Sequence, residues 1–327
     1  MGVMETDLLE RRAQLQQEID QLRREKDAVL LAHNYQLPEV QDVADFVGDS
    51  LALARYAVRC EARRIVLCGV AFMAETAAIL APDKQVLLPD LEAGCSLADS
   101  ITAQQLAEWK AEHPDAVVVS YVNTSAAVKA LSDYCCTSSN AVDVVNAIDP
   151  QREILFLPDF FLGSYVRRVT GRTNLYIWMG ECHVHASILP EEMERRMEDH
   201  PDAQLLVHPE CGCTTRALAL PPQGREVRVL STDAMLRHAK ESHAQQFIVA
   251  TEVGMLYRLS KENPQKAFLP ADEKAICPFM KRITLEKVRD ALADERYEIK
   301  LDPQIRERAL LPLQRMVAIG GRPTNAE

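Results

Sequence analysis

Several features that place proteins in membranes, outside the cell or on nucleic acids are missing from this sequence. No apolar run approaches the roughly 20 residues of a membrane-spanning helix, and the first residues lack the apolar core of a signal peptide. Lysine and arginine form no dense cluster, and the formal net charge of -11 argues against a nucleic-acid-binding surface. These absences predict a cytoplasmic protein that acts on small molecules.

The cysteines lack the local pairing that is typical of zinc modules and disulfide frameworks. The chain has 9 cysteines but no Cys-x-x-Cys, the kind of short pair that four-cysteine zinc modules normally contain. In a long chain without a secretion signal, scattered cysteines favour a reducing compartment, with metal-binding or catalytic roles for some of them. Six are expected to be core or pocket-lining residues, with a redox role left open for the last four: Cys60, Cys68, Cys135, Cys136, Cys211 and Cys213.

What the sequence does contain is one layout repeated three times. Each copy opens with an apolar run that ends in polar side chains, at 29–35, 117–123 and 205–210. A polar pair, a helical pattern and a second apolar run follow, and each copy closes on a lone cysteine. His33, Tyr121 and His208 lie 88 and 87 positions apart, and the lone cysteines lie 87 and 95 apart. This period is longer than that of solenoid repeats and indicates whole domains. The lone cysteines are Cys95, Cys182 and Cys277.

Strand patterns that alternate with helical patterns predict parallel sheets covered by helices. We expect an α/β protein of three similar three-layer αβα domains, related by pseudo-threefold symmetry around a central active site. The first copy should contain a strand at 28–33, helices at 36–48 and 51–62, and a strand at 63–69. Residues 5–27 should form an amphipathic helix that covers the domains, with a partner-binding coiled coil as the alternative. The predicted domains are 1–100 with the N-terminal helix, 101–187, and 188–327 with the C-terminal helices.

Polar side chains stand at or just beyond the end of the first strand in all three copies. Ligands of parallel α/β sheets bind outside the carboxyl ends of the strands. One such histidine or tyrosine alone would be read as a hydrogen-bonded residue at the edge of the core. Because the position is polar in every copy, a shared pocket is the better interpretation. Its candidate residues are His33, Asn34, Tyr35, Tyr121, Asn123, His208 and Glu210.

Ser50, Ser138 and Thr232 each stand just before a helical pattern. Taken singly, each would be an ordinary helix N-cap that contributes about 1 kcal/mol of stability. If all three open on one centre, their hydroxyls and the helix N–H groups can also bind carboxylate or phosphate. The two interpretations are compatible.

Three lone cysteines, one from each domain, suit a [4Fe-4S] cluster in which three irons have protein ligands. The fourth iron would then be free to bind and polarise a hydroxyl or carbonyl oxygen as a Lewis acid. Structural zinc and three inert buried thiols are the alternatives. The cluster ligands would be Cys95, Cys182 and Cys277.

Several stretches together resemble the quinolinate synthase family, the A proteins of bacterial NAD biosynthesis, over essentially the whole chain. The most specific are AHNYQLPEVQDVADFVGDS, SYVNTSAAVKALSDYCCTSSNAV, MGECHVH, HPEC and CPFMKRITLEKV. The resemblance implies three αβα domains and the condensation of iminoaspartate with dihydroxyacetone phosphate to quinolinate, with release of phosphate and two waters. An L-aspartate oxidase is the expected source of iminoaspartate.

The resemblance also implies roles for individual residues. Cys95, Cys182 and Cys277 match the ligands of the [4Fe-4S] cluster, and Tyr35 matches a residue of the active site. Glu210 is the hypothetical principal acid/base residue, with His208, His33 and the two tyrosines also able to exchange protons. The positions that match substrate-binding residues are His33, Ser50, Tyr121, Asn123, Ser138, His208, Glu210 and Thr232.

Two departures from the family pattern and two rival functions accompany this interpretation. Leu230 stands where relatives commonly have glycine, which changes the expected turn at Thr232, and no further cysteine lies near Cys277 to support a redox switch. A [4Fe-4S] hydro-lyase acting on another dicarboxylate would fit the same cluster. A non-enzymatic iron-sulfur sensor would fit too, but it predicts a partner or nucleic-acid surface, and the sequence has no basic patch.

Overall fold

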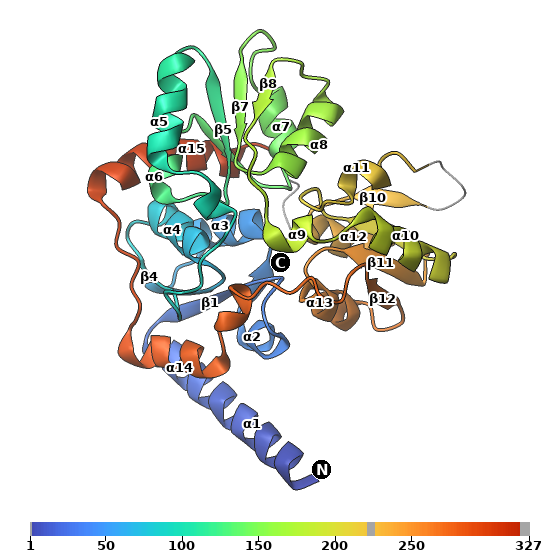
Figure 1. The fold of residues 1–327 in the computed structure, drawn as a ribbon. Coiled ribbons are helices and arrows are strands. Elements are labelled where there is room, and N and C mark those ends of the chain that lie inside the picture. The colour runs from blue at the N-terminus through green and yellow to red at the C-terminus, as the bar shows by residue number, and fades with distance from the viewer. Residues whose placement is uncertain (1, 221–225, 321–327) are drawn as a thin grey trace.

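The computed structural model describes residues 2–220 and 226–320 and contains three four-stranded parallel sheets with helices packed against them (Figure 1). The predicted α/β class is therefore confirmed. We call each sheet, together with the helices between its strands, a unit. In each unit the first strand lies between the second and the third, in the orders β2-β1-β3-β4, β6-β5-β7-β8 and β10-β9-β11-β12. The pseudo-threefold relation and the domain boundaries stay predictions.

The strands are short, and the helices vary from 4 to 24 residues. The first sheet comprises β1 (Ala28–His33), β2 (Phe46–Gly48), β3 (Arg64–Cys68) and β4 (Gln85–Leu87). The second comprises β5 (Val117–Tyr121), β6 (Tyr134–Cys136), β7 (Ile154–Leu157) and β8 (Leu175–Ile177). The third comprises β9 (Gln204–Val207), β10 (Val227–Val229), β11 (Gln246–Ala250) and β12 (Ala267–Pro270).

The helices lie between these strands and at both ends of the described chain. Those of the first half are α1 (Gly2–Glu25), α2 (Pro38–Val43), α3 (Ser50–Arg59), α4 (Ala71–Leu80), α5 (Ala103–Glu112), α6 (Ala126–Lys129), α7 (Ala141–Asn146) and α8 (Phe160–Thr170). Those of the second half are α9 (His183–Ala186), α10 (Pro190–Asp199), α11 (Thr214–Ala217), α12 (Thr232–Glu241), α13 (Met255–Glu262), α14 (Leu285–Asp294) and α15 (Pro303–Ala318). Single 3-10 turns are η1 (Ala98–Ser100) and η2 (Met280–Arg282). No described helix is both long and apolar enough to cross a lipid bilayer.

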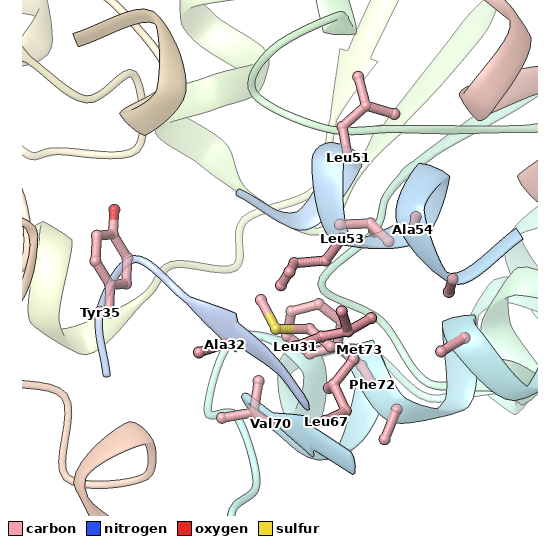
Figure 2. Packing of buried hydrophobic residues seen from close by; sticks show 14 of the residues in the cluster. Leu31, Ala32, Tyr35, Leu51, Leu53, Ala54, Leu67, Val70, Phe72 and Met73 are labelled. Carbon is pink, nitrogen blue, oxygen red and sulfur yellow. The ribbon is translucent and has the colours of Figure 1, made fainter. Parts of the chain in front are cut away.

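The first strand of each unit is apolar because both faces of its sheet are covered. Every residue of β5 is buried, as is all of β1 after its first residue. In the first unit, Leu31 of β1 and Leu67 of β3 pack against Phe72 and Met73 of α4, with Leu53 of α3 closing the cluster (Figure 2). Such buried runs are typical of parallel sheets and explain why these strands could be predicted.

The second strand of each unit was not predicted. The expected helix at 36–48 ends at Val43, and residues 46–48 form β2 instead. Pro38 does occupy the first turn of α2, as expected. Like β2, both β6 and β10 have only three residues, too few to show a period in sequence. Pairing with the first strand is what makes these segments extended.

Strand register brings each first-strand end beside the polar pair that follows the second strand. His33 pairs with Gly48, Tyr121 with Cys136, and Val207 with Val229. The residues that come next on both strands therefore lie side by side at the carboxyl edge of each sheet. Parallel pairing thus assembles the two halves of each repeated motif.

The C-terminal helices lie against the first and second units. Helix α14 packs against α1 and β3, and α15 packs against β6 and α6 of the second unit and α3 and α4 of the first (Figure 1). Side chains of those units hold the end of α15: Arg55 donates to the carbonyls of Val317 and Gly320, and Asn140 to those of Met316 and Ile319. Helix α15 therefore fastens the first two units together.

This packing predicts unequal effects for two leucines of α15. Leu313 is fully buried, whereas Leu311 on the same helix is 53% exposed. Leu313→Ala should lower the free energy of unfolding by about 3 kcal/mol, because it leaves a cavity between two units. Leu311→Ala, the matched control, should change it by less than about 0.5 kcal/mol. Urea unfolding followed by circular dichroism measures both, and equal effects would contradict the described packing.

Candidate active site

A largely buried cavity lies where the three units meet and has about 70 Å³ of space that water can occupy. Every residue to which the sequence assigns a ligand, binding or catalytic role lines it. These residues are His33, Tyr35, Ser50, Cys95, Tyr121, Asn123, Ser138, Cys182, His208, Glu210, Thr232 and Cys277. Their placement agrees with the shared pocket predicted from the repeat, whereas their roles in binding and catalysis stay predictions.

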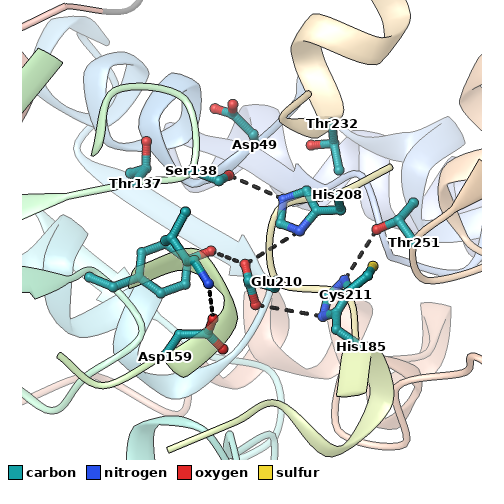
Figure 3. A network of polar contacts seen from close by, with 12 residues as sticks. Asp49, Thr137, Ser138, Asp159, His185, His208, Glu210, Cys211, Thr232 and Thr251 are labelled. Atoms are coloured by element: carbon teal, nitrogen blue, oxygen red, sulfur yellow. Dashed lines mark hydrogen bonds and ion pairs between the residues drawn. The ribbon is translucent and has the colours of Figure 1, made fainter. Parts of the chain in front are cut away.

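Glu210 stands at the centre of a buried polar network (Figure 3). The Tyr121 hydroxyl donates a short hydrogen bond to Glu210 Oε1. The Nδ1 atoms of His185 and His208 lie 3.6 Å from the two oxygens of the same carboxyl group. His208 Nε2 lies 3.1 Å from Ser138 Oγ, which links the third unit to the second. The network therefore offers a carboxyl group, a phenol and two imidazoles to one space.

Tyr35, His185 and Thr251 form a second set of contacts beside this network. The Tyr35 hydroxyl lies 2.5 Å from Thr251 Oγ1 and 3.2 Å from His185 Nε2, and the latter two atoms are 3.1 Å apart. Tyr35 follows β1, His185 lies in α9, and Thr251 follows β11. Because the hydroxyl and imidazole groups can each donate or accept, a proton can shift among the three.

Burial favours the neutral forms of the ionisable groups in the cavity. It raises the pKa of Glu210 to about 7, against the lowering effect of the Tyr121 hydrogen bond. Burial lowers the pKa of His185 to about 4, and burial together with Lys281 lowers that of His33 to about 3. At neutral pH these histidines are therefore uncharged, and Glu210 is close to the midpoint of its titration.

The helix starts differ from the prediction in one respect. Ser50, Ser138 and Thr232 are not N-caps. Asp49 caps α3 by accepting from the Ala52 N–H, and Ser231 caps α12 in the same way. The cap is the residue whose backbone is still extended, which places Ser50 and Thr232 at the first helical position. Their hydroxyls are consequently free of the capping role and face the cavity.

Buried polar contacts also join the units around the rim of the cavity. Asn34, a predicted pocket residue, is fully buried at this rim and donates to Thr232 Oγ1 (2.8 Å) and Asp233 Oδ1 (3.0 Å). Its side-chain oxygen accepts from Arg258 (2.7 Å). Burial and the neighbouring Asp49 raise the pKa of Asp233 to about 7, and Arg258 opposes that rise. Asp49 in turn accepts a short hydrogen bond from the Ser139 hydroxyl of the second unit. The first unit is thereby held to both others.

The three lone cysteines have the same local geometry. Each carbonyl accepts a hydrogen bond from the N–H four residues on, at 3.1 Å for Cys95, 2.8 Å for Cys182 and 3.2 Å for Cys277. Each sulfur in turn faces the N–H groups of the residues two and three positions later. These are Leu97 and Ala98 for the first sulfur, Val184 and His185 for the second, and Phe279 and Met280 for the third.

This arrangement fits a site that holds thiolates on iron. Burial raises the pKa of Cys95 to about 12 and also raises those of Cys182 and Cys277, so the free thiolates are disfavoured. A bound metal centre would supply the positive charge that ionises them, and N–H groups facing the sulfur are typical of cluster ligands. One ligand atom from each of Cys182, His185 and Glu210 also lies within 4.8 Å of the other two.

The remaining cysteines are not part of the cavity wall. The prediction that the 135–136 pair and the 211–213 pair line the pocket is wrong, because these four thiols are fully buried among core residues. The Cys211 thiol donates to the Ala250 carbonyl at 3.1 Å. Cys68 is a fully buried core residue of β3, and Cys60 is half-buried at the end of α3. Both are small core-packing residues, as expected.

Several cavity residues were missed because they do not repeat. His185 lies three positions after Cys182, where the other copies have Ala98 and Met280. Glu252 of the cavity wall follows β11, a third strand, as does Thr251, which contacts Tyr35 and His185, whereas the prediction considered only first-strand ends. The polar ends of third strands were a usable signal, since these also reach the carboxyl edge of the sheet.

Comparison with known proteins identifies the family. A sequence model described as "Quinolinate synthetase A protein" matches residues 17–318. The chain belongs to the quinolinate synthase family. A quinolinate synthase of Thermus thermophilus is 57% identical over 306 residues, which cover 94% of this chain and 97% of that protein. The enzyme of the same name from Mycobacterium sp. (strain KMS) is 57% identical over 307 residues, covering 93% and 91%. That of Mycobacterium tuberculosis is 56% identical over 307 residues, covering 93% and 88%.

The rim contacts predict a large cost for removing Asn34. Asn34→Ala leaves the buried Asp233 carboxyl and the Arg258 guanidinium each without one partner, which should cost about 2–3 kcal/mol of unfolding free energy. Asn146→Ala, an exposed asparagine at the end of α7, is the matched control and should cost less than about 0.5 kcal/mol. Urea unfolding of both variants provides the measurement. A cost for Asn34→Ala as small as the control's would show that the rim contacts do not join the units.

Proposed function

We propose that this protein is a quinolinate synthase that condenses iminoaspartate with dihydroxyacetone phosphate and releases phosphate and two waters. Membership of the family supports the product, and its place in NAD biosynthesis in the cytoplasm follows from that activity. The observation that carries the proposal is that three cysteine loops and the Tyr121–Glu210 pair face one cavity. Metal-assisted dehydration needs a metal site and proton-exchanging groups within reach of the same substrate.

The polar wall of the cavity suits substrates that carry two carboxylates and a phosphate. Ser50 and Thr232 offer hydroxyls at the first turns of α3 and α12, where the helix N–H groups also favour anions. Asn123 Oδ1 is buried without a hydrogen-bond partner in the described part of the chain and can accept from a substrate N–H or O–H. Local donors of this kind bind anions despite the net charge of -11.

Ring formation requires tautomerisation, imine formation and two losses of water, and each of these moves protons. Glu210 is the principal acid/base residue, because a carboxyl group with a pKa of about 7 can both take and return a proton near neutral pH. The Tyr121 hydroxyl orients Glu210 Oε1 through its hydrogen bond. Tyr35 relays protons through its contacts with His185 and Thr251. Burial lowers the pKa of His208 and His33, so both are weak bases in the empty cavity, and the negative charge of a bound substrate would raise their pKa and let them exchange a proton.

Cys95, Cys182 and Cys277 would hold the [4Fe-4S] cluster. When bound, the cluster supplies an iron without a cysteine ligand, a Lewis acid that polarises a substrate oxygen. The side chains of the cavity then position that substrate and exclude bulk water. A functional link to an L-aspartate oxidase is what the family resemblance implies, and no physical complex is implied.

Iron and sulfide analysis tests the cluster. Anaerobically purified protein should contain four irons and four sulfides per chain, as expected of one [4Fe-4S] cluster. Cys95→Ala, Cys182→Ala and Cys277→Ala should each lose the cluster absorbance and turnover, because each removes one of three ligands. Cys68→Ala, a buried cysteine away from the cavity, is the matched control and should keep the cluster. A single metal ion without sulfide would overturn the cluster assignment.

Substitution of Glu210 tests the acid/base role. Glu210→Gln should reduce turnover of iminoaspartate and dihydroxyacetone phosphate by at least about 10²-fold, the usual contribution of one acid/base group. Its cluster absorbance should match that of the unsubstituted protein, since no cysteine changes. Glu198→Gln, at an exposed position of α10, should behave as the unsubstituted protein. Retained turnover in Glu210→Gln would remove Glu210 from the role, and hydration of a simple dicarboxylate instead of quinolinate formation would favour a hydro-lyase.

A further inference from the structure

A second hollow adjoins the cavity on the side of the helix starts. It has about 680 Å³ of space that water can occupy, against about 70 Å³ for the cavity itself, and the two share Asp49 and Ser138 in their walls. The reacting groups inside are almost fully buried, with Glu210 2% and Tyr121 4% exposed. Substrates must therefore reach these groups from outside the cavity, and the outer hollow is the larger space beside it.

The outer hollow carries charged side chains at equivalent places in the repeat. Arg55 stands five residues after Ser50, and Arg237 stands five residues after Thr232. In the second unit Asp143 holds the equivalent place, five residues after Ser138. Two cations and one carboxylate thus follow the three hydroxyls that line the inner cavity.

The charges of this hollow differ in whether protein groups already engage them. Arg55 donates to the carbonyls at the end of α15. The Asp49 carboxyl accepts from Ala52 and Ser139, and the Asp233 carboxyl faces Asn34 and Arg258. Arg237, half-buried on α12, has no hydrogen bond or ion pair with any other described residue. Its guanidinium is the cation left to meet an incoming ligand.

We propose that Arg237 is an outer binding residue for small anions, which pairs with the phosphate or carboxylate of a substrate before it enters the inner cavity. The inference rests on the proposed function, because it concerns the route of that reaction's substrates. In a chain with a net charge of -11, anions are repelled at long range, and a guanidinium at the opening offsets that repulsion locally. Guanidinium groups also pair well with phosphate and carboxylate oxygens. The Asp143 carboxylate, which lines the same hollow from the second unit, repels such anions.

Steady-state kinetics of paired variants tests the proposal. Arg237→Gln should raise KM about fivefold for whichever substrate uses the site, with kcat within about twofold of the unsubstituted protein, because the residue lies outside the reacting groups. Asp143→Asn should lower the same KM. KM is measured separately for dihydroxyacetone phosphate and iminoaspartate, so the two arms show whether phosphate or carboxylate is bound. Raised salt should weaken both effects.

Controls separate this inference from the proposed function. Arg228→Gln removes an exposed cation of β10 that is paired with Glu226, and it should leave both KM values unchanged. If the unsubstituted protein forms quinolinate but Arg237→Gln keeps both KM values, only the inference fails. If no quinolinate forms, the proposed function fails, and calorimetric titration with inorganic phosphate still tests the site. Binding of phosphate that Arg237→Gln does not weaken would overturn it.

Discussion

Pairing of buried polar atoms across unit boundaries is the constraint on which this structure depends. The polar atoms that join the three units are largely buried, and a buried polar group left without a partner costs about 1–3 kcal/mol. Asn34, Asp49 and Ser138 each find their partner in a different unit. The units consequently cannot separate without exposing or orphaning these atoms. The same contacts join the walls of the inner cavity and so fix the distance between them.

Burial sets the chemistry of the cavity as well as its shape. The low pKa of the histidines and the raised pKa of Glu210 and the thiols share one cause, the loss of solvation for a charge. Such a site is close to electrically neutral until a metal centre or an anionic substrate enters. Charge introduced there interacts strongly, because buried surroundings screen it less than bulk water does. Negative charge that develops on a substrate oxygen would therefore interact strongly with several side chains at once.

The parts of the site that could be predicted are those that depend on local and repeated patterns. His33, Tyr121 and His208 follow buried first strands, and the lone cysteines recur at nearly one period, so their convergence could be inferred before any coordinates. The three-residue strands β2, β6 and β10 could not, because pairing with a neighbour makes them extended. His185 was missed for a different reason: it is polar in one copy only. The sequence also does not reveal that Asp49 rather than Ser50, and Ser231 rather than Thr232, is the helix cap. That choice depends on the backbone conformation of a single residue.

The position of α15 has a consequence for how the protein is made. This helix lies between the first and second units and is held there by Arg55 and Asn140. Both units are synthesised well before residues 303–318 emerge from the ribosome. Until then, their common interface lacks the apolar surface that α15 covers in the finished fold. During synthesis, the apolar surface of these two units is therefore exposed to non-native contacts until α15 is made and covers it.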